Sequence, residues 1–251
     1  MNDPYAVTAD YYHLMSEPYW RQLRPVLADA LRQVDPAVGP VLDIGAGTGL
    51  STRVVADALP AARIVALEPS TAMCAVLRTR TADDPALHGR VTIHAATLAE
   101  AEPALPPVLS AVVATAVLHH FDPDERRLLT RLLAERLAPG APAFVEVQEP
   151  PAPCRIPRTR YHASAVGDLV YEGWMGAEPS GADTMDWTMT YRTTSAGRVL
   201  DERSARFTMH PIPLARMEAE AAEAGLATRR LGSGLLELRT PGAGQDPKHA
   251  G

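Results

Sequence analysis

The sequence predicts an α/β fold in which a doubly wound, mostly parallel sheet carries helices on both faces. Short apolar runs alternate with helical segments from residue 41 to residue 149, and several runs are apolar throughout, as strands buried on both faces are. Alternating strands and helices favour parallel pairing with right-handed crossovers. The chain has 251 residues, 46% of them hydrophobic, which suits one domain with a sizeable core.

The first element is an amphipathic helical segment over residues 10–35, in which Leu23, Leu27 and Leu31 share one face. Asp35-Pro36 ends it. The core strands are then expected at residues 41–44, 64–67, 91–95, 111–117 and 143–147, and the core helices at 51–59, 70–80 and 123–137.

Two of these helices have clear start signals. Ser70 is a favourable N-cap for the second. For the third, Asp122 caps, Pro123 takes the first helical position and Glu125 completes a capping box.

After residue 149 the pattern changes. Residues 150–182 are rich in Pro and Gly, with a short helix expected around 161–172. Two strand-like stretches flank Ala196-Gly197 and predict a β-hairpin over 185–195 and 199–209. The remaining expected elements are a helix near 213–224, strands near 227–231 and 234–239 with the last strand antiparallel, and a disordered tail from Pro241.

Composition narrows the classes of partner. The formal net charge is −6 at pH 7 and the pI is about 5.7, whereas nucleic-acid binders usually carry a basic face, so DNA, RNA and anionic membranes are disfavoured. No apolar run is long enough to span a bilayer and the N-terminus lacks a signal-type apolar segment, so a cytoplasmic protein is expected. Cys74 and Cys154 lack the spacing of a zinc site, and no metal is expected.

The most informative stretch joins the first strand to the first helix. It reads Val-Leu-Asp-Ile-Gly-Ala-Gly-Thr-Gly over residues 41–49, with Asp43 before a GxGxG loop. Glycines there allow backbone torsions and a close ligand approach that a Cβ would block. The spacing differs from the GxGxxG of dinucleotide-binding folds, and Glu68 closes the second strand 23 residues after Gly45.

Together these features resemble motif I of class I S-adenosylmethionine-dependent methyltransferases, which have a Rossmann-like fold. The resemblance spans residues 40–150, with weaker agreement to about residue 240. It implies S-adenosyl-L-methionine as the cofactor, with Asp43 near its amino-acid end and Glu68 accepting from the ribose hydroxyls. The other residues expected at the cofactor are Gly45, Ala46, Gly47 and Gly49 of the loop, Pro69 and Met73 beside the adenine, Ala96 and Thr97 at the adenine amino group, and Ala114 and Thr115 at the ammonium.

The sequence departs from the family pattern at two positions that bear on the expected cofactor site. Ala96 stands where the family often has Asp, so the backbone there or the Thr97 hydroxyl would have to substitute. Ser110 stands where an acid usually opens the fourth strand.

The acceptor side is expected beyond the fourth strand. His120 resembles a histidine that several methyltransferase families place facing the acceptor, where an imidazole can act as a general base; His119 is the second candidate. Alternatively, one histidine packs in the core or caps the next helix. Other expected acceptor-side residues are Tyr11, Tyr12 and His13 of an N-terminal lid, Gln148 after the fifth strand, and Tyr161 and Trp174 of the insertion; the insertion aromatics could equally form a satellite core.

The function expected from the resemblance is methyl transfer to O, N or C of a small-molecule metabolite or natural product. The alternatives are a cyclase or isomerase of the same fold that binds the cofactor without methylating, a non-catalytic partner subunit and, disfavoured by the glycine spacing, a nicotinamide-dependent dehydrogenase. The expected partner is a small-molecule acceptor, and binding to nucleic acid or to a membrane is not expected. A homodimer remains possible. The expected division of the chain is a helical lid over 1–40, the cofactor-binding core over 41–149, the acceptor-side insertion over 150–210, the end of the core over 211–240 and the tail over 241–251.

Overall fold

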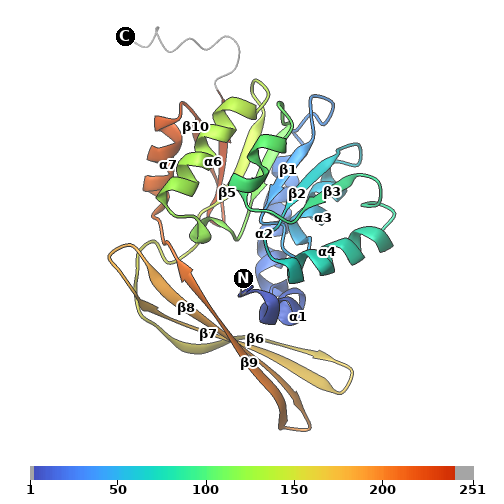
Figure 1. Ribbon diagram of the computed structural model, residues 1–251, viewed down its shortest axis with the longest axis vertical. Coiled ribbons are helices and arrows are strands. Elements are labelled where there is room, and N and C mark those ends of the chain that lie inside the picture. The colour runs from blue at the N-terminus through green and yellow to red at the C-terminus, as the bar shows by residue number, and fades with distance from the viewer. Residues whose placement is uncertain (1–2, 241–251) are drawn as a thin grey trace.

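A computed structural model describes residues 3–240, which form two sheets with a helix lying between them (Figure 1). The larger sheet has seven strands in the order β10-β11-β5-β4-β1-β2-β3. Strands β1 to β5 are parallel, β11 is antiparallel to β5, and β10 is antiparallel to β11. The bounds are β1 Val41–Ile44, β2 Ile64–Leu67, β3 Val91–His94, β4 Ala111–Ala114, β5 Pro142–Glu146, β10 Ala227–Gly232 and β11 Leu235–Arg239.

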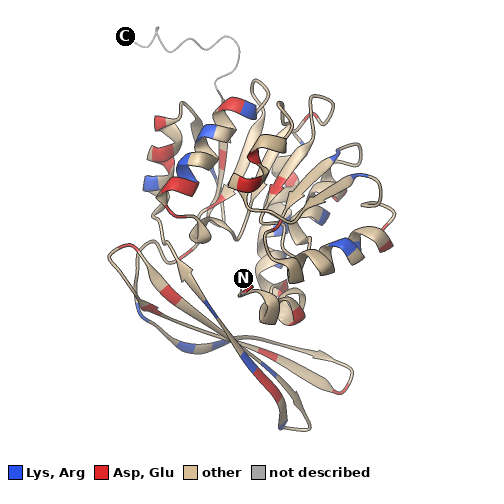
Figure 2. Cartoon of the chain, in the orientation of Figure 1, with Lys and Arg blue, Asp and Glu red and all other residues tan. Residues whose placement is uncertain are grey.

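Helices cover both faces of this sheet, as predicted. Leu129 of α6 and Met217 of α7 belong to the core on one face, and Leu27 of α2 and Val54 of α3 to the core on the other. These helices carry basic and acidic residues side by side, as α6 and α7 show in Figure 2. The bounds are α1 Ala6–Met15, α2 Glu17–Leu31, α3 Leu50–Ala58, α4 Thr71–Asp83, α5 Leu98–Ala101, α6 Pro123–Arg136 and α7 Leu214–Glu223, with short 3₁₀ helices η1 Glu102–Ala104 and η2 Leu118–His120.

The predicted helix starts are confirmed in detail. Asp122 Oδ1 accepts the backbone N–H of Asp124 and of Glu125, and Glu125 returns the contact to the backbone of Asp122. Ser70 Oγ accepts the N–H of Met73 at the start of α4. Each cap satisfies backbone donors that the first helical turn leaves without an intrahelical partner.

The insertion after β5 is a four-stranded antiparallel sheet, which we call the insertion sheet. Its order is β6-β7-β8-β9, with β6 Ile156–Val166, β7 Leu169–Pro179, β8 Met185–Ser195 and β9 Arg198–Met209. The predicted hairpin is β8 and β9, whose turn residues Ala196 and Gly197 both have positive φ.

The helix expected around residues 161–172 is wrong. Those residues lie in β6 and β7, which are joined by Gly167-Asp168, and Gly167 has a φ of 58°. A glycine-led pair between two strands is a hairpin signal, and it outweighs the modest helical preference of the alanines before it.

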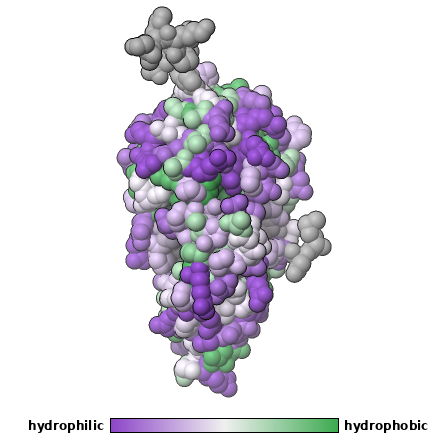
Figure 3. Space-filling model, turned by 90° about the vertical axis from the view of Figure 1, so that its left-hand side faces the viewer, coloured by the Kyte–Doolittle hydropathy of each residue, from purple (hydrophilic) through white to green (hydrophobic). Residues whose placement is uncertain are grey.

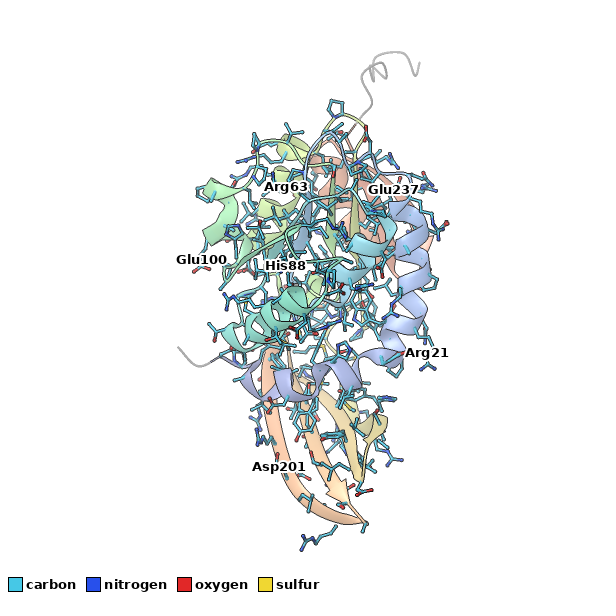
Figure 4. All side chains as sticks on the ribbon, turned by 90° about the vertical axis from the view of Figure 1, so that its right-hand side faces the viewer. Arg21, Arg63, His88, Glu100, Asp201 and Glu237 are labelled. Carbon is cyan, nitrogen blue, oxygen red and sulfur yellow. The ribbon has the colours of Figure 1, made fainter. Side chains whose placement is uncertain are left out.

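The N-terminal helical segment is two helices, with a break at Ser16. Helix α1 lies across one end of the insertion sheet (Figure 4), with Tyr11 and Met15 buried against Tyr191. At the far tip of the insertion sheet, exposed apolar side chains gather in the strands next to the two hairpin turns, and Figure 3 shows an apolar patch there: Val166, Val170, Val199 and Leu200.

The tail predicted to be disordered from Pro241 lies outside the described residues. No described helix has the length and apolar character needed to cross a membrane.

Candidate functional site

The glycine loop follows β1 at the carboxyl edge of the larger sheet. Gly45, Gly47 and Gly49 have φ values of 68°, 56° and 87°, a region that residues with a side chain rarely adopt. A Cβ on Gly45 would lie 2.7 Å from Val117 Cγ2, and one on Gly49 would lie 2.5 Å from Leu77 Cδ1. The loop can therefore take this shape only with glycine at these places.

Asp43 lies beneath the loop and is completely buried. Its Oδ2 accepts hydrogen bonds from Ser51 Oγ at 2.8 Å and Thr52 Oγ1 at 2.6 Å, while Oδ1 has no partner among the described residues. Burial raises the pKa of Asp43 to about 6, and the two hydroxyl donors oppose that rise. The buried Thr48 Oγ1, in the same loop, also lacks a described partner.

Glu68 joins the loop to the start of α4. Its Oε2 accepts the N–H of Gly47 at 2.8 Å, and its Oε1 accepts the N–H of Ser70 at 2.7 Å. Burial raises the pKa of this carboxyl, and the two backbone donors counter it. The predicted contact between Glu68 and a ribose stays a prediction.

The remaining cofactor candidates differ in how they lie. Pro69 is exposed directly after Glu68, whereas Met73 is buried in α4. Ala96 is partly buried against the core. The Thr97 hydroxyl already bonds Glu100 in the cap of α5, so it is less free to replace the missing Asp than the sequence suggested.

At the end of β4, Ala114 and Thr115 are buried, and the next residue has a positive φ of 55°. The N–H of Ala116 donates to Glu146 Oε2 at 2.8 Å, which holds this strained turn. Burial raises the pKa of Glu146. Together with Asp43 and Glu68, it makes the edge rich in carboxylates.

These features fit S-adenosylmethionine. The ligand carries an ammonium, a sulfonium and a ribose diol, and this edge of the sheet offers buried carboxylates, buried oxygens without described partners and a glycine backbone that has no room for added Cβ atoms at Gly45 and Gly49. In the described part of the chain, no group of at least three His, Cys, Asp or Glu side chains has the arrangement of a metal site.

The N-terminal segment lies over this edge and contacts the chain after four neighbouring strands. After β2, Asp3 Oδ2 accepts a hydrogen bond from Ser70 Oγ at 2.8 Å, and after β4, Tyr5 Oη lies 2.6 Å from His120 Nε2. After β1, the Tyr12 ring lies 3.6 Å from the position that a Cβ of Gly47 would take. At the end of β5, the Tyr19 hydroxyl donates to Glu146.

Of the three predicted lid residues, only Tyr12 lies against the glycine loop. Tyr11 turns to the insertion sheet, where it stacks on Tyr191 with 4.9 Å between ring centroids and bonds Thr193 and Asp201. His13 is exposed on the same helix. The structure therefore does not bring Tyr11 and His13 to the cleft.

The two histidines occupy different surroundings. The His119 ring donates to the backbone carbonyl of Gln148, is buried, and has an Nε2 without a described partner. The Gln148 side-chain oxygen also lacks a described partner. His120 faces Tyr5 and Phe207, and its pKa falls to about 4 because of burial and the nearby His119 and His210. That value lies below the working range assumed for a general base, so a catalytic role for His120 stays a prediction.

The insertion residues divide between the two faces of the insertion sheet. Tyr161 packs on Gly173 and belongs to the cluster against α1. Trp174 follows Gly173 in β7, and successive residues of a strand point to opposite faces of the sheet, so Trp174 lies on the face away from Tyr161. Three guanidinium groups surround its ring, with Arg158 at 4.7 Å from the centroid, Arg192 at 5.7 Å and Arg160 at 5.9 Å. The structure thus places Trp174 away from the cleft.

The sequence did not single out Asp3, Tyr5 or Tyr19 as site residues. One signal could have found the tyrosines: hydroxyl-bearing aromatics in a segment that the resemblance places over the cofactor. No local spacing shows their partners, since Tyr5 and His120 are 115 residues apart.

The model of a family described as "Methyltransferase domain" matches residues 41–140. No curated protein sequence matches the chain. Among solved structures, the chain is similar to CalS10, an amino pentose methyltransferase of Micromonospora echinaspora, with 21% identity, a TM-score of 0.68, and 88% of this chain and 92% of that chain covered. DesVI of Streptomyces venezuelae has 19% identity, a TM-score of 0.70 and coverage of 92% and 96%. The sugar N-methyltransferase KedS8 of a Streptoalloteichus species has 17% identity, a TM-score of 0.66 and coverage of 87% and 86%. At these identities the likeness shows the fold.

Proposed function

We propose that this chain, whose residues 41–140 match a methyltransferase-domain model, is a class I, S-adenosylmethionine-dependent methyltransferase that methylates an amino nitrogen of a small natural product or its sugar. The observation that carries the proposal is the carboxylate-rich edge above the larger sheet. Asp3, Asp43, Glu68 and Glu146 all lie there, and no arginine or histidine of residues 3–240 forms an ion pair with any of them. Such an edge favours cationic ligands.

When bound, S-adenosylmethionine supplies a methyl group on a sulfonium, which is already activated for direct transfer. Asp43 would order the glycine loop near the amino-acid end, and Glu68 would accept from the ribose while holding Gly47. The main task left to the chain is to align the acceptor with the methyl group and to exclude water. The N-terminal segment, which contacts the chain after four strands, is suited to both.

The acceptor would enter between the carboxyl edge of the larger sheet and the inner face of the insertion sheet. On that face Tyr161, Tyr171 and Met189 remain partly exposed beside the cluster that α1 covers, and they make it aromatic and apolar apart from the two tyrosine hydroxyl groups. A sugar ring packs well on such a surface while its amine points to the carboxylates. CalS10 is described as an amino pentose methyltransferase and KedS8 as a sugar N-methyltransferase, and both descriptions support nitrogen as the acceptor.

Calorimetric titration with S-adenosylmethionine and with S-adenosylhomocysteine tests the cofactor part. We expect micromolar-range binding of both, lost in Asp43→Ala and in Glu68→Ala. The matched control is Glu218→Ala, which removes a partly buried carboxylate of α7 that pairs with Arg230, away from the glycine loop. Failure of the folded wild-type protein to bind either ligand would refute the cofactor assignment.

Mass spectrometry after incubation with a panel of amino sugars and their hydroxyl analogues tests the acceptor part. We expect one added methyl group on amines and none on the matched alcohols. Methylation of the alcohols alone would show that oxygen is the acceptor, and a change of product without a mass increase would indicate the non-methylating alternative.

A homodimer and a cytoplasmic location stay predictions of the sequence. Light scattering of the purified chain measures the first, and fractionation of the producing cells measures the second.

A further inference from the structure

Tyr5 stands where the N-terminal segment, the chain after β4 and the insertion sheet meet. Its Oη lies 2.6 Å from His120 Nε2, and its ring contacts the His120 ring edge-on with 5.6 Å between centroids. The same ring lies 4.6 Å from that of Phe207 in β9, and its backbone N–H donates to Asp3. Contacts with two distant parts of the chain, together with the local backbone bond to Asp3, hold the Tyr5 ring in place.

The hydrogen bond between Tyr5 and His120 joins two neutral side chains. His120 is neutral at pH 7, since burial and the facing His119 and His210 lower its pKa to about 4. Tyr5 keeps its proton, since burial and the facing Tyr12, Glu68, Tyr191 and Asp3 raise its pKa. Two neutral partners allow two arrangements: the Tyr5 hydroxyl donates to Nε2 when the ring proton of His120 is on Nδ1, and it accepts from Nε2 when the proton is there.

We propose that Tyr5 is a positioning residue for the acceptor: its hydroxyl proton is committed to His120 Nε2, so that its free lone pairs accept an N–H of the acceptor amine and orient the nitrogen toward the methyl group. A hydroxyl whose donor is engaged can only accept from a third group, so the pair selects ligands that bear a donor. The inference rests on the proposed function, since it names the group that meets the amine.

Two consequences distinguish this arrangement from a general base. His120 fixes the polarity of Tyr5 and need not take up a proton. Tyr5 belongs to the N-terminal segment, so the acceptor contact exists only when that segment lies over the cleft.

The first experiment observes the pair without any acceptor. Long-range ¹H–¹⁵N NMR of the histidine rings should show His120 neutral at pH 7 with the proton on Nδ1, and Tyr5→Phe should shift its Nε2 resonance. Tyr171→Phe, which alters a tyrosine of the aromatic cluster, is the control and should leave that resonance unchanged. A proton on Nε2, or no response to Tyr5→Phe, would overturn the inference.

The second experiment uses the amine that the panel identifies. Tyr5→Phe keeps the ring contacts, so we expect unchanged S-adenosylhomocysteine affinity and melting temperature, with kcat/KM lowered about 10- to 100-fold by the lost hydrogen bond. His120→Gln retains an acceptor for Tyr5 and should preserve most activity. His120→Phe should match Tyr5→Phe, and the double variant should be no worse than either.

The outcomes separate this inference from the proposed function. Full activity of Tyr5→Phe, or a loss of cofactor affinity as large as the loss of activity, would overturn the positioning role. A wild-type protein that binds the cofactor and methylates no amine would refute the acceptor class and the amine contact with it. The NMR result would still decide whether Tyr5 donates to His120.

Discussion

Gly45 is the residue of the loop at which a side chain is expected to do most harm. Its φ is 68°, and a Cβ would lie 2.7 Å from Val117 Cγ2. We expect Gly45→Ala to lower the free energy of unfolding by about 3 kcal/mol, since the left-handed conformation costs about 1 kcal/mol and overpacking adds to it. Urea denaturation measures the loss.

Gly89→Ala is the matched control for that substitution. Gly89 has a φ of 78° with nothing within 4 Å of an added Cβ, so only the backbone penalty of about 1 kcal/mol should appear. Equal losses in the two variants would show that the contact with Val117 is unimportant.

At the scale of single residues, the sequence placed the carboxylates of the candidate site at the strand ends and did not place the tyrosines of the N-terminal segment. Asp43 and Glu68 could be placed because Asp43 is the next-to-last residue of β1 and Glu68 directly follows β2, and the carboxyl ends of parallel strands share one edge. Tyr5 and Tyr19 could not be placed, because their partners depend on how the N-terminal segment crosses the sheet. That path is set by tertiary packing, which leaves no periodic trace in the sequence.

Among the elements, α1 connects the lid to the insertion sheet. Tyr11 is buried at 4% exposure and stacks on Tyr191, so Tyr11→Ala should lower the free energy of unfolding by about 3 kcal/mol or detach α1. We expect hydrogen exchange to accelerate both in α1 and in the central strands of the insertion sheet.

His13→Ala provides the comparison on the same helix. His13 is exposed, so its removal should leave hydrogen exchange in α1 and in the insertion sheet unchanged. If both variants behaved alike, the stacked tyrosines would not be what couples the helix to the sheet.

The elements of the core were predicted closely, and those of the insertion in part. Continuous apolar runs identified β1 and β2 to the residue. In β6 the alternation of side chains is interrupted by register shifts between Ile156 and Thr159 and between Arg160 and His162. An interrupted period of two hides a strand, and only the Gly167-Asp168 turn still signals it.

For the whole molecule, two sets of buried groups oppose each other as the pH changes. The pKa of Asp43 is raised to about 6, so the folded state holds a proton that the unfolded chain releases above pH 4, and stability falls as the pH rises from 4 to 6. The pKa of His120 is lowered to about 4, so stability falls as the pH decreases from 6.5 to 4. Each contribution is about 3 kcal/mol at 1.36 kcal/mol per pKa unit, so the contributions of these two groups oppose each other over this range.

Single substitutions should reveal how each group makes the free energy of unfolding depend on pH. Asp43→Asn removes the carboxyl, so its free energy of unfolding should rise between pH 4 and pH 6.5. His120→Gln removes the imidazole, so its free energy of unfolding should fall over the same range. Urea denaturation at several pH values measures both, and parallel curves for the two variants would contradict the assignment.

The contacts of α1 also bear on the order in which the chain assembles. Tyr11 bonds Thr193, 182 residues later, and the Tyr191 hydroxyl donates to Thr8 across 183 residues. During synthesis α1 leaves the ribosome before every other described helix, yet the part of its binding surface that the insertion sheet supplies exists only after β8 and β9 have been translated. The first of the described helices to be made therefore completes its docking late, and its side chains that face the insertion sheet stay uncovered until then.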